Sequence, residues 1–177
     1  MKWGHSSFPG KRGQACLALM LASLLAGCAS SPPPRQPPAP QWQGSGGGAE
    51  VRVNDALADL ALQLRGSPYR YGGATRDGFD CSGLVFYAHR HFGLIVPRTS
   101  RDQAKAAREV EERKLRRGDL VFFKIGSRHV NHVGIFIGDR QFVHAPGAGK
   151  PVTVNSLDDD YYSLRFSSAG RFWDRGP

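Results

Sequence analysis

The chain has 177 residues, of which 40% are hydrophobic, and a formal net charge of +9. This length is enough for one domain with a core of its own, and the sequence contains no internal repeat. The basic residues are scattered along the chain, a pattern that argues against nucleic-acid binding. The charge suits an anionic polymer or a lipid headgroup surface, and solubility alone also explains it.

The N-terminal segment 1–27 is typical of a bacterial export signal. Basic residues precede an apolar stretch from 15 to 26, which is too short to span a bilayer stably. The stretch ends in Leu25-Ala26-Gly27-Cys28, which resembles the lipobox of bacterial lipoproteins. The alternative is an ordinary signal peptide that contains this tetrapeptide by chance.

The lipobox resemblance implies that segment 1–27 is removed and that Cys28 is lipidated. Two or more acyl chains form a durable membrane anchor, because each buried methylene contributes about 0.8 kcal/mol. We therefore expect a periplasmic protein anchored to a membrane. Ala29, in place of an aspartate, indicates the outer membrane.

A tether is expected over 28–50, which is rich first in proline and then in glycine. It buries too little apolar surface to fold, and it reaches on the order of 60 Å at about 3 Å per residue. The folded domain is expected over 51–177. Loss of the signal removes three basic residues and no acidic ones, so the formal charge falls from +9 to +6.

One cysteine remains in the expected mature domain. Cys16 leaves with the signal and Cys28 carries lipid, so Cys81 has no partner for a disulfide. Exported proteins usually pair their thiols or lack them. A lone cysteine therefore indicates either a reactive thiol or a small buried apolar side chain.

Apolar residues at helical spacing predict three helices early in the domain. The first begins with Asn54 as N-cap and ends at Gly66, and the second covers 81–93. A capping-box pattern at Ser100 predicts a third helix that ends near Glu109.

Short apolar and β-branched runs follow and predict an antiparallel sheet. A glycine-containing turn at 138–140 is expected to join two of these strands into a hairpin. The fold class is therefore α+β, with N-terminal helices packed on an antiparallel sheet. The expected strands are 118–124, 132–139 and 141–145, with edge strands over 151–157 and 167–173.

Cys81 is predicted in the first turn of the second helix, directly after the N-cap candidate Asp80. Unpaired N–H groups and the positive end of the helix dipole favour a thiolate there. Gly83 costs helix propensity, about 1 kcal/mol, and we expect it to leave room for a substrate backbone.

A thiolate nucleophile needs a base and a group that orients the base. His132 begins one predicted strand and His144 lies on the next, so a tight hairpin brings both to one face of the sheet. If that face packs on the N-terminus of the cysteine helix, the three side chains form a Cys–His–His set. Taken singly, each histidine is more typical of a structural or surface position.

Six blocks of the domain resemble, in order, the NlpC-type bacterial cell-wall peptidases, which have a papain-like fold. The lipobox and tether further resemble the Spr-type murein endopeptidase lipoproteins. The blocks are GSPYRYGG (66–73), FDCSGLV (79–85), VPRTSRDQ (96–103), RRGDLVFF (116–123), NHVGIFIGD (131–139) and FVHA (142–145).

The resemblance implies that Cys81 is the nucleophile, His132 the base and His144 the third polar residue. It places Tyr69 beside the cysteine, where its hydroxyl would stabilise the oxyanion together with a backbone N–H. Ordinary half-buried packing explains Tyr69 equally simply.

The resemblance further puts Asp80 and Ser82 at substrate-contacting positions, and a capping role alone also explains Asp80. Arg98 and Gln103 match family positions without an assigned role.

Other polar groups suggest no further chemistry. His129 forms an HxxH pattern with His132, but these positions face opposite sides of a strand, so we expect no metal and no cofactor. His89 and His91 are expected at solvated positions, and 158–162 as an acidic surface loop.

The leading hypothesis is a cysteine endopeptidase that hydrolyses peptidoglycan stem peptides, as a monomer. The D-alanyl–diaminopimelate crosslink is favoured over the D-glutamyl–diaminopimelate bond, because of the Spr-like layout. A non-catalytic wall-binding lipoprotein and a thiol acyltransferase or amidase are the alternatives.

Overall fold

The structure is a computed structural model that describes residues 52–173. The predictions for the signal, the lipidation of Cys28 and the tether concern residues outside this range. Among the described residues, no helix has the length and apolar character needed to cross a membrane.

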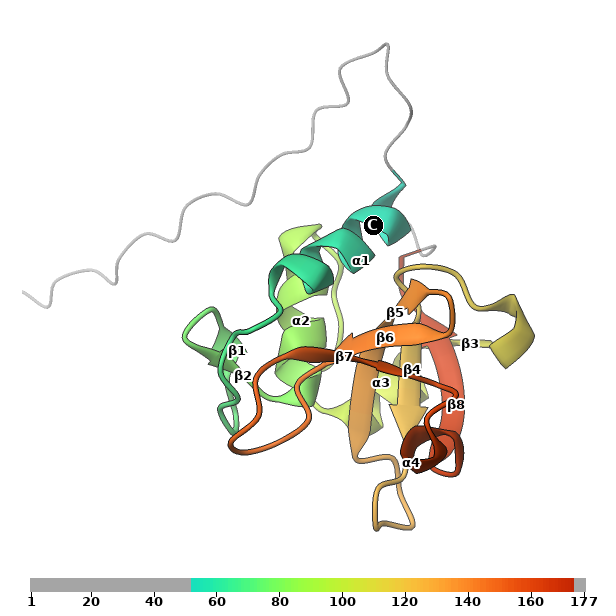
Figure 1. The fold of residues 1–177 in the computed structure, drawn as a ribbon. Helices are drawn as coiled ribbons and strands as arrows, with labels where there is room; N and C mark the ends of the chain where they lie inside the picture. Colours follow the sequence, from blue (N-terminus) through green and yellow to red (C-terminus); the bar gives the residue numbers. More distant parts are fainter. Residues whose placement is uncertain (1–51, 174–177) are drawn as a thin grey trace, which may run out of the picture. The chain divides into compact units, whose positions relative to one another are not determined.

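The helices lie mainly in the first half of the described chain, as predicted (Figure 1). The second helix begins at the predicted cysteine and ends close to the predicted glycine. The helical elements are α1 (Val53–Gln63), α2 (Cys81–His91), α3 (Ser100–Ala106), the 3-10 turn η1 (Glu112–Lys114) and α4 (Asp160–Ser163).

A six-stranded antiparallel sheet has the strand order β3-β8-β4-β5-β6-β7, and a separate two-stranded ribbon pairs β1 with β2. The α+β prediction is therefore confirmed. The strands are β1 (Ala74–Thr75), β2 (Gly78–Phe79), β3 (Arg108–Val110), β4 (Leu120–Phe123), β5 (His132–Gly138), β6 (Gln141–His144), β7 (Thr153–Ser156) and β8 (Phe166–Arg171).

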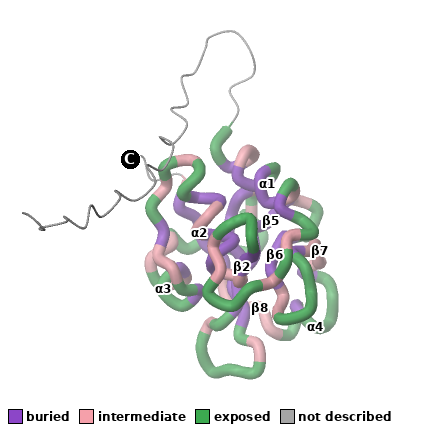
Figure 2. The backbone as a smooth tube through the Cα atoms, turned by 90° about the vertical axis from the view of Figure 1, so that its left-hand side faces the viewer, coloured by how far each residue is buried: buried purple, intermediate pink, exposed green. Residues whose placement is uncertain are grey.

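Both faces of the sheet are covered by apolar side chains. Successive residues of β4 point to opposite faces: Leu120 and Phe122 pack toward α1 and α2, while Val121 and Phe123 pack under α4. The buried stretches of α1, α2 and the central strands meet in the interior (Figure 2). The central strands are thus fixed from both sides, and they carry the two histidines.

Two helix caps differ from the prediction by one or two residues. The N-cap of α1 is Arg52, and Asn54 is buried within the first turn. The N-cap of α3 is Thr99, whose hydroxyl accepts a hydrogen bond from the Asp102 N–H. Ser100 is then the first helical residue and is buried.

The third helix is shorter than predicted, and the strand order differs as a result. Ala107 is extended, and the chain enters β3, which pairs with β8. The C-terminal strand therefore lies inside the sheet and not at its edge. β7 is at the other edge, as predicted.

The predicted hairpin turn is present between β5 and β6. Asp139 and Arg140 both have positive φ angles, 49° and 56°, the backbone of the mirror-image turn that matches the twist of paired strands. Register along the hairpin begins at Ile135 opposite Val143. His132 is therefore diagonal to His144 and not directly opposite it.

His89 is fully buried, contrary to the expectation of a solvated position, whereas His91 is exposed. The Nδ1 of His89 lies 2.9 Å from the Val85 carbonyl oxygen, and the Nε2 of His89 has no partner. Burial lowers the pKa of His89 to about 4. The imidazole is therefore neutral, and its Nδ1 donates to the carbonyl.

Candidate active site

Cys81 is the first residue of α2, and Asp80 is its N-cap. The carboxylate Oδ1 of Asp80 accepts from the Gly83 N–H at 2.6 Å, which satisfies one of the free donors of the first turn. The cap sets the direction of the helix start and so the position of the sulfur. Within the described residues Cys81 is a free thiol.

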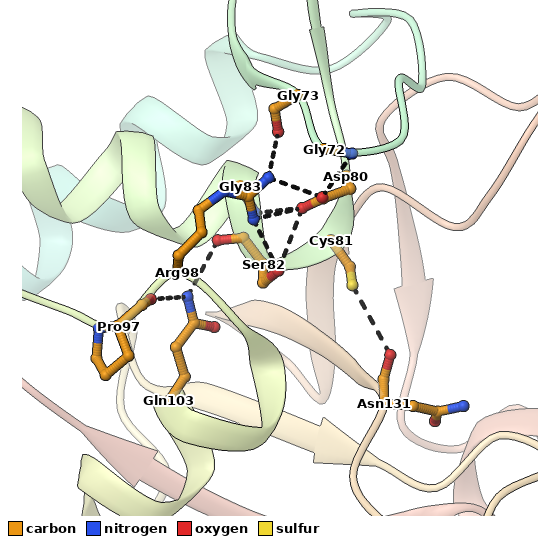
Figure 3. Close-up of polar contacts among 10 residues, drawn as sticks. All are labelled: Gly72, Gly73, Asp80, Cys81, Ser82, Gly83, Pro97, Arg98, Gln103 and Asn131. Atoms are coloured by element: carbon orange, nitrogen blue, oxygen red, sulfur yellow. Dashed lines mark hydrogen bonds and ion pairs between the residues drawn. The ribbon is translucent and has the colours of Figure 1, made fainter.

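The sulfur faces the beginning of β5. Cys81 Sγ lies 4.0 Å from the Asn131 carbonyl oxygen (Figure 3). A backbone hydrogen bond from the Val133 N–H lowers the pKa of the Cys81 thiol. His132 lies between these two residues. The structure thus brings the predicted nucleophile to the strand that carries the predicted base.

Burial raises the pKa of the Cys81 thiol, and the Asp80 carboxylate raises it further. Backbone N–H groups act in the opposite direction but do not outweigh them. The helix start alone favours a thiolate, so the sequence-based expectation omitted the desolvation of the site. The pKa of this thiol therefore lies above its ordinary value and not below it.

Asp80 is held by more than its cap. Arg98 donates from Nη2 to Asp80 Oδ2 at 2.7 Å and from Nη1 to Oδ1 at 2.9 Å (Figure 3). Ser82 Oγ and the Gly72 N–H donate to the same carboxylate. Burial would raise the pKa of Asp80, but the donors from Arg98, the Gly83 N–H and Ser82 outweigh it and keep that pKa below its ordinary value. Arg98 therefore has a structural role that sequence reasoning left open.

Gln103 has a similar anchoring role, also unassigned from the sequence. Its buried Nε2 donates to the Ser82 carbonyl at 3.0 Å and to the Pro97 carbonyl at 2.8 Å. Ser82 itself is buried, and Arg98 donates to its hydroxyl at 3.0 Å. The predicted substrate contacts of Asp80 and Ser82 remain predictions, since both side chains already have partners.

The space at Gly83 is filled by the chain itself and not kept for a substrate. A Cβ at this position would overlap the Gly73 carbonyl oxygen. Arg98 Nη2 donates to the same carbonyl at 3.2 Å, so the loop before β1 is held against the start of α2. Glycine is required because of this close backbone approach.

Tyr69 lies in that loop, paired to Phe79 by an isolated parallel bridge. Burial raises the pKa of the Tyr69 hydroxyl, and the neighbouring Cys81 and Asp80 raise it further. The phenol therefore interacts electrostatically with Cys81, and at neutral pH it is protonated and able to donate a hydrogen bond.

The two histidines contact each other directly. His132 Nε2 lies 2.7 Å from His144 Nδ1, and both rings are buried. His144 Nε2 is 2.9 Å from Asn155 Oδ1, and Asn155 Nδ2 donates to Asp159 Oδ2 at 3.1 Å. The chain of contacts therefore runs from β5 through β6 and β7 to the start of α4.

This chain of contacts assigns the proton positions. Asn155 Nδ2 donates to the Asp159 carboxylate oxygen, so the amide nitrogen of Asn155 faces Asp159 and its oxygen faces His144. His144 then carries its proton on Nε2 and accepts at Nδ1 from His132 Nε2–H. His132 Nδ1 is left as an acceptor, the state that a general base for a thiol requires.

Both imidazoles are neutral. Burial lowers the pKa of His132 to about 3, with a contribution from His144. Burial also lowers the pKa of His144 to about 4, although Asn155 opposes it. A neutral imidazole can accept a proton, so His132 is in the protonation state that the predicted general base requires.

Sequence reasoning missed three residues near His144. Asn155 and Asp159 extend the chain of contacts, and the Tyr162 hydroxyl lies 3.3 Å from His144 Nε2. Segment 158–162 was expected as an acidic surface loop, but it begins α4 and Tyr162 is buried. The only available signal was Asn155 itself, one of three polar residues in the predicted edge strand 151–157.

Among the described residues, no three histidine, cysteine or acidic side chains are grouped in a way that would hold a metal ion. His129 is exposed in the loop before β5.

The sequence of residues 66–171 matches the model of the NlpC/P60 family. The chain belongs to this family. It is 41% identical over 158 residues to the probable endopeptidase NlpC of Escherichia coli K12, a match covering 88% of this chain and 97% of that protein.

A second relative and a solved structure support the same family membership. The E. coli K12 murein DD-endopeptidase MepS/murein LD-carboxypeptidase is 40% identical over 126 residues, 71% of this chain and 66% of that protein. The crystal structure of an NlpC/P60 family protein from Bacillus cereus superposes with a TM-score of 0.65 at 32% identity, over 68% of this chain and 40% of that one. The fold predicted from the sequence blocks is therefore confirmed.

Proposed function

We propose that this chain is a cysteine peptidase that hydrolyses amide bonds in peptidoglycan stem peptides. The observation that carries the proposal is the buried His132–His144 contact of 2.7 Å at the strand facing the Cys81 sulfur. Family membership and the names of both relatives, an endopeptidase and a murein endopeptidase, support the substrate class.

In the proposed reaction the Cys81 sulfur attacks the scissile carbonyl carbon, and His132 Nδ1 takes the thiol proton. His144 holds the ring of His132 and stabilises its charged form through Nδ1. The tetrahedral oxyanion accepts hydrogen bonds from the Tyr69 hydroxyl and the Cys81 backbone N–H. Asp80 and Ser82, at the start of α2, are retained as proposed substrate contacts.

The proton on His132 then passes to the leaving amine as the C–N bond breaks, which leaves a thioester on Cys81. Water attacks the thioester carbonyl, and His132 takes a proton from that water. The released sulfur recovers this proton, and the product leaves as a carboxylic acid. Every proton is accounted for by one imidazole, so the mechanism needs no cofactor.

For the bond that is cut, we propose the D-alanyl–diaminopimelate crosslink. Similarity to a relative named as a murein DD-endopeptidase supports this choice. The D-glutamyl–diaminopimelate bond is the alternative within the same mechanism.

The test is mass spectrometry of purified muropeptides after incubation with the full chain or with Cys81→Ala. Crosslinked dimers should become monomers with the native chain, and the variant should lose at least about 10⁴-fold in rate. Stems that end in D-glutamate would move the scissile bond. Binding without cleavage would favour the non-catalytic wall-binding module, and an equally active Cys81→Ala would exclude the mechanism.

We further propose that the protein acts as a monomer, anchored through lipid on Cys28 to the periplasmic side of the outer membrane. The sequence from Leu25 to Cys28 supports the anchor. Labelled palmitate should enter the native chain but not Cys28→Ala, and membrane fractionation should find the native chain in the outer membrane. Incorporation into both proteins would contradict the assignment of Cys28.

A further inference from the structure

A groove of about 450 Å³ lies between α3 and the loop that joins β4 to β5. It does not include the residues assigned to catalysis. Its lining combines two small or apolar side chains with five basic or imidazole ones: Arg101, Ala104, Lys105, Lys124, Arg128, His129 and Val130.

The four lysine and arginine side chains of this groove form no ion pair with a carboxylate of residues 52–173. Three arginines elsewhere in the domain have carboxylate partners: Arg98 pairs with Asp80, Arg117 with Asp59 and Arg140 with Glu112. Like charges collected in one hollow repel each other and focus a positive potential into it. Such an arrangement suits an anionic ligand.

Both walls of the groove are fixed to residues that adjoin Cys81. On α3, Arg101 and Lys105 flank Gln103, which donates to the Ser82 carbonyl (Figure 3). On the loop, the Asn131 side chain closes the turn through paired hydrogen bonds of 2.8 Å to the Ile125 N–H and carbonyl. The carbonyl oxygen of the same Asn131 is the one that faces Cys81 Sγ.

The groove is therefore close to the reacting atoms. Val130, in its lining, is two residues before His132, so their Cα atoms lie within about 8 Å at 3.8 Å per residue. An extended peptide covers about 3.3–3.6 Å per residue. A substrate group two or three residues from the scissile bond reaches the groove.

We propose that this groove binds free carboxylates of the stem peptide on one side of the scissile bond. Glutamate and diaminopimelate each have two carboxyl groups and use one in the peptide chain, so each retains an anionic group. The inference rests on the proposed function and adds a charge-selecting subsite to it. A concave site beside the catalytic residues fits a peptide better than it fits a flat lipid surface.

The test measures binding separately from hydrolysis, with the full chain carrying Cys81→Ala. Its affinity is measured for muropeptides with free carboxylates and for the same muropeptides with those carboxylates amidated. The groove variant adds Lys105→Gln and Arg128→Gln. The matched control adds Arg52→Gln and Arg65→Gln, which remove the same charge at the two ends of α1, away from the groove.

We expect the groove variant to bind the free-carboxylate muropeptides about five- to tenfold more weakly, since each exposed charge pair contributes up to about fivefold to an affinity. The control should change less than twofold. Amidation should weaken binding by a similar factor in the control and have little effect in the groove variant. Arg128→Lys, which keeps the charge, should bind nearly as well as the parent.

Equal losses in the groove and control variants, or no effect of amidation, would overturn the proposal. Groove-dependent binding to vesicles with anionic phosphatidylglycerol, without an effect of amidation, would assign the groove to a membrane surface. If the native chain does not hydrolyse muropeptides but the groove pattern is observed, the proposed reaction fails and the carboxylate site stands.

Discussion

Two arginine–aspartate pairs of similar geometry differ in how far their side chains are buried. Arg98 and Asp80 lie beside Cys81 with side chains 35% and 14% exposed, whereas Arg171 and Asp119 lie in the sheet with 7% and 0%. The pKa of Asp80 is lowered, but burial raises that of Asp119 in spite of its arginine and the donors from Trp173 and the backbone.

The difference shows that identical partners serve different purposes. At Asp80 burial is less complete, so the donors from Arg98, Gly83 and Ser82 outweigh it and lower the pKa of the carboxyl, which maintains a strong cap at the start of α2. At Asp119 the pair mainly prevents a buried charge from being unpaired, and it joins β8 to the turn before β4. One pair supports the site, and the other supports the sheet under it.

The largest expected effect comes from breaking the buried pair. Arg171→Leu should lower the free energy of unfolding by about 3–5 kcal/mol, because it leaves Asp119 charged and buried. Urea denaturation measures the change. The control Arg171→Leu with Asp119→Asn should recover part of it, and activity per folded molecule should be nearly unchanged in both. A loss below about 1 kcal/mol in the single variant would contradict the role assigned to the pair.

Buried imidazoles make the stability of the fold depend on pH, in addition to the effect of the two arginine–aspartate pairs. His89 is neutral when folded, with a pKa of about 4, but in the unfolded chain it takes up a proton below its ordinary 6.5. The unfolded state then binds more protons, so stability falls as the pH decreases from about 6.5 toward 4. The slope from one histidine is at most about 1.4 kcal/mol per pH unit.

Denaturation of the native chain and of His89→Leu across this pH range measures that contribution. The variant should have a shallower slope, and His132 and His144, whose pKa values are lowered in the same direction, contribute to the slope that remains. Parallel slopes in the two proteins would show that His89 is protonated or accessible in the folded state.

The smallest change in stability is expected at the partly exposed pair of Arg98 and Asp80. Arg98→Ala should lower the free energy of unfolding by only about 1 kcal/mol, yet reduce kcat/KM for muropeptides about tenfold or more, because the cap beside the nucleophile loosens. Arg98→Lys keeps a charge but not the two-pronged geometry, and it should be intermediate. If Arg98→Ala destabilised the fold as strongly as Arg171→Leu, the two pairs would contribute equally to stability, and the different roles assigned to them would be wrong.

Much of the fold and part of the site could be predicted from the sequence. Periodicity located the main helices and strands, since their apolar faces are repeated locally. A single remaining cysteine and two histidines on a predicted hairpin indicated Cys81, His132 and His144 before any contact was known.

The remainder depended on distant contacts. Asn155 and Asp159 reach His144 only because β7 pairs with β6. β3 is too short to have a pattern of its own and is defined by β8. His89 lies at a buried helix position, although a polar residue is usually predicted at the surface. The pKa of Cys81 depends on how deeply the start of α2 is buried.

The close packing of Gly83 on the Gly73 carbonyl has a consequence for protein engineering. Tyr69, the loop at Gly73 and the first turn of α2 are held together by backbone contacts and by the Arg98 side chain. A design that transfers Cys81 to another scaffold must therefore carry segment 69–83 and this arginine as one cassette. Grafting the helix alone would leave Cys81 without the surroundings that position it.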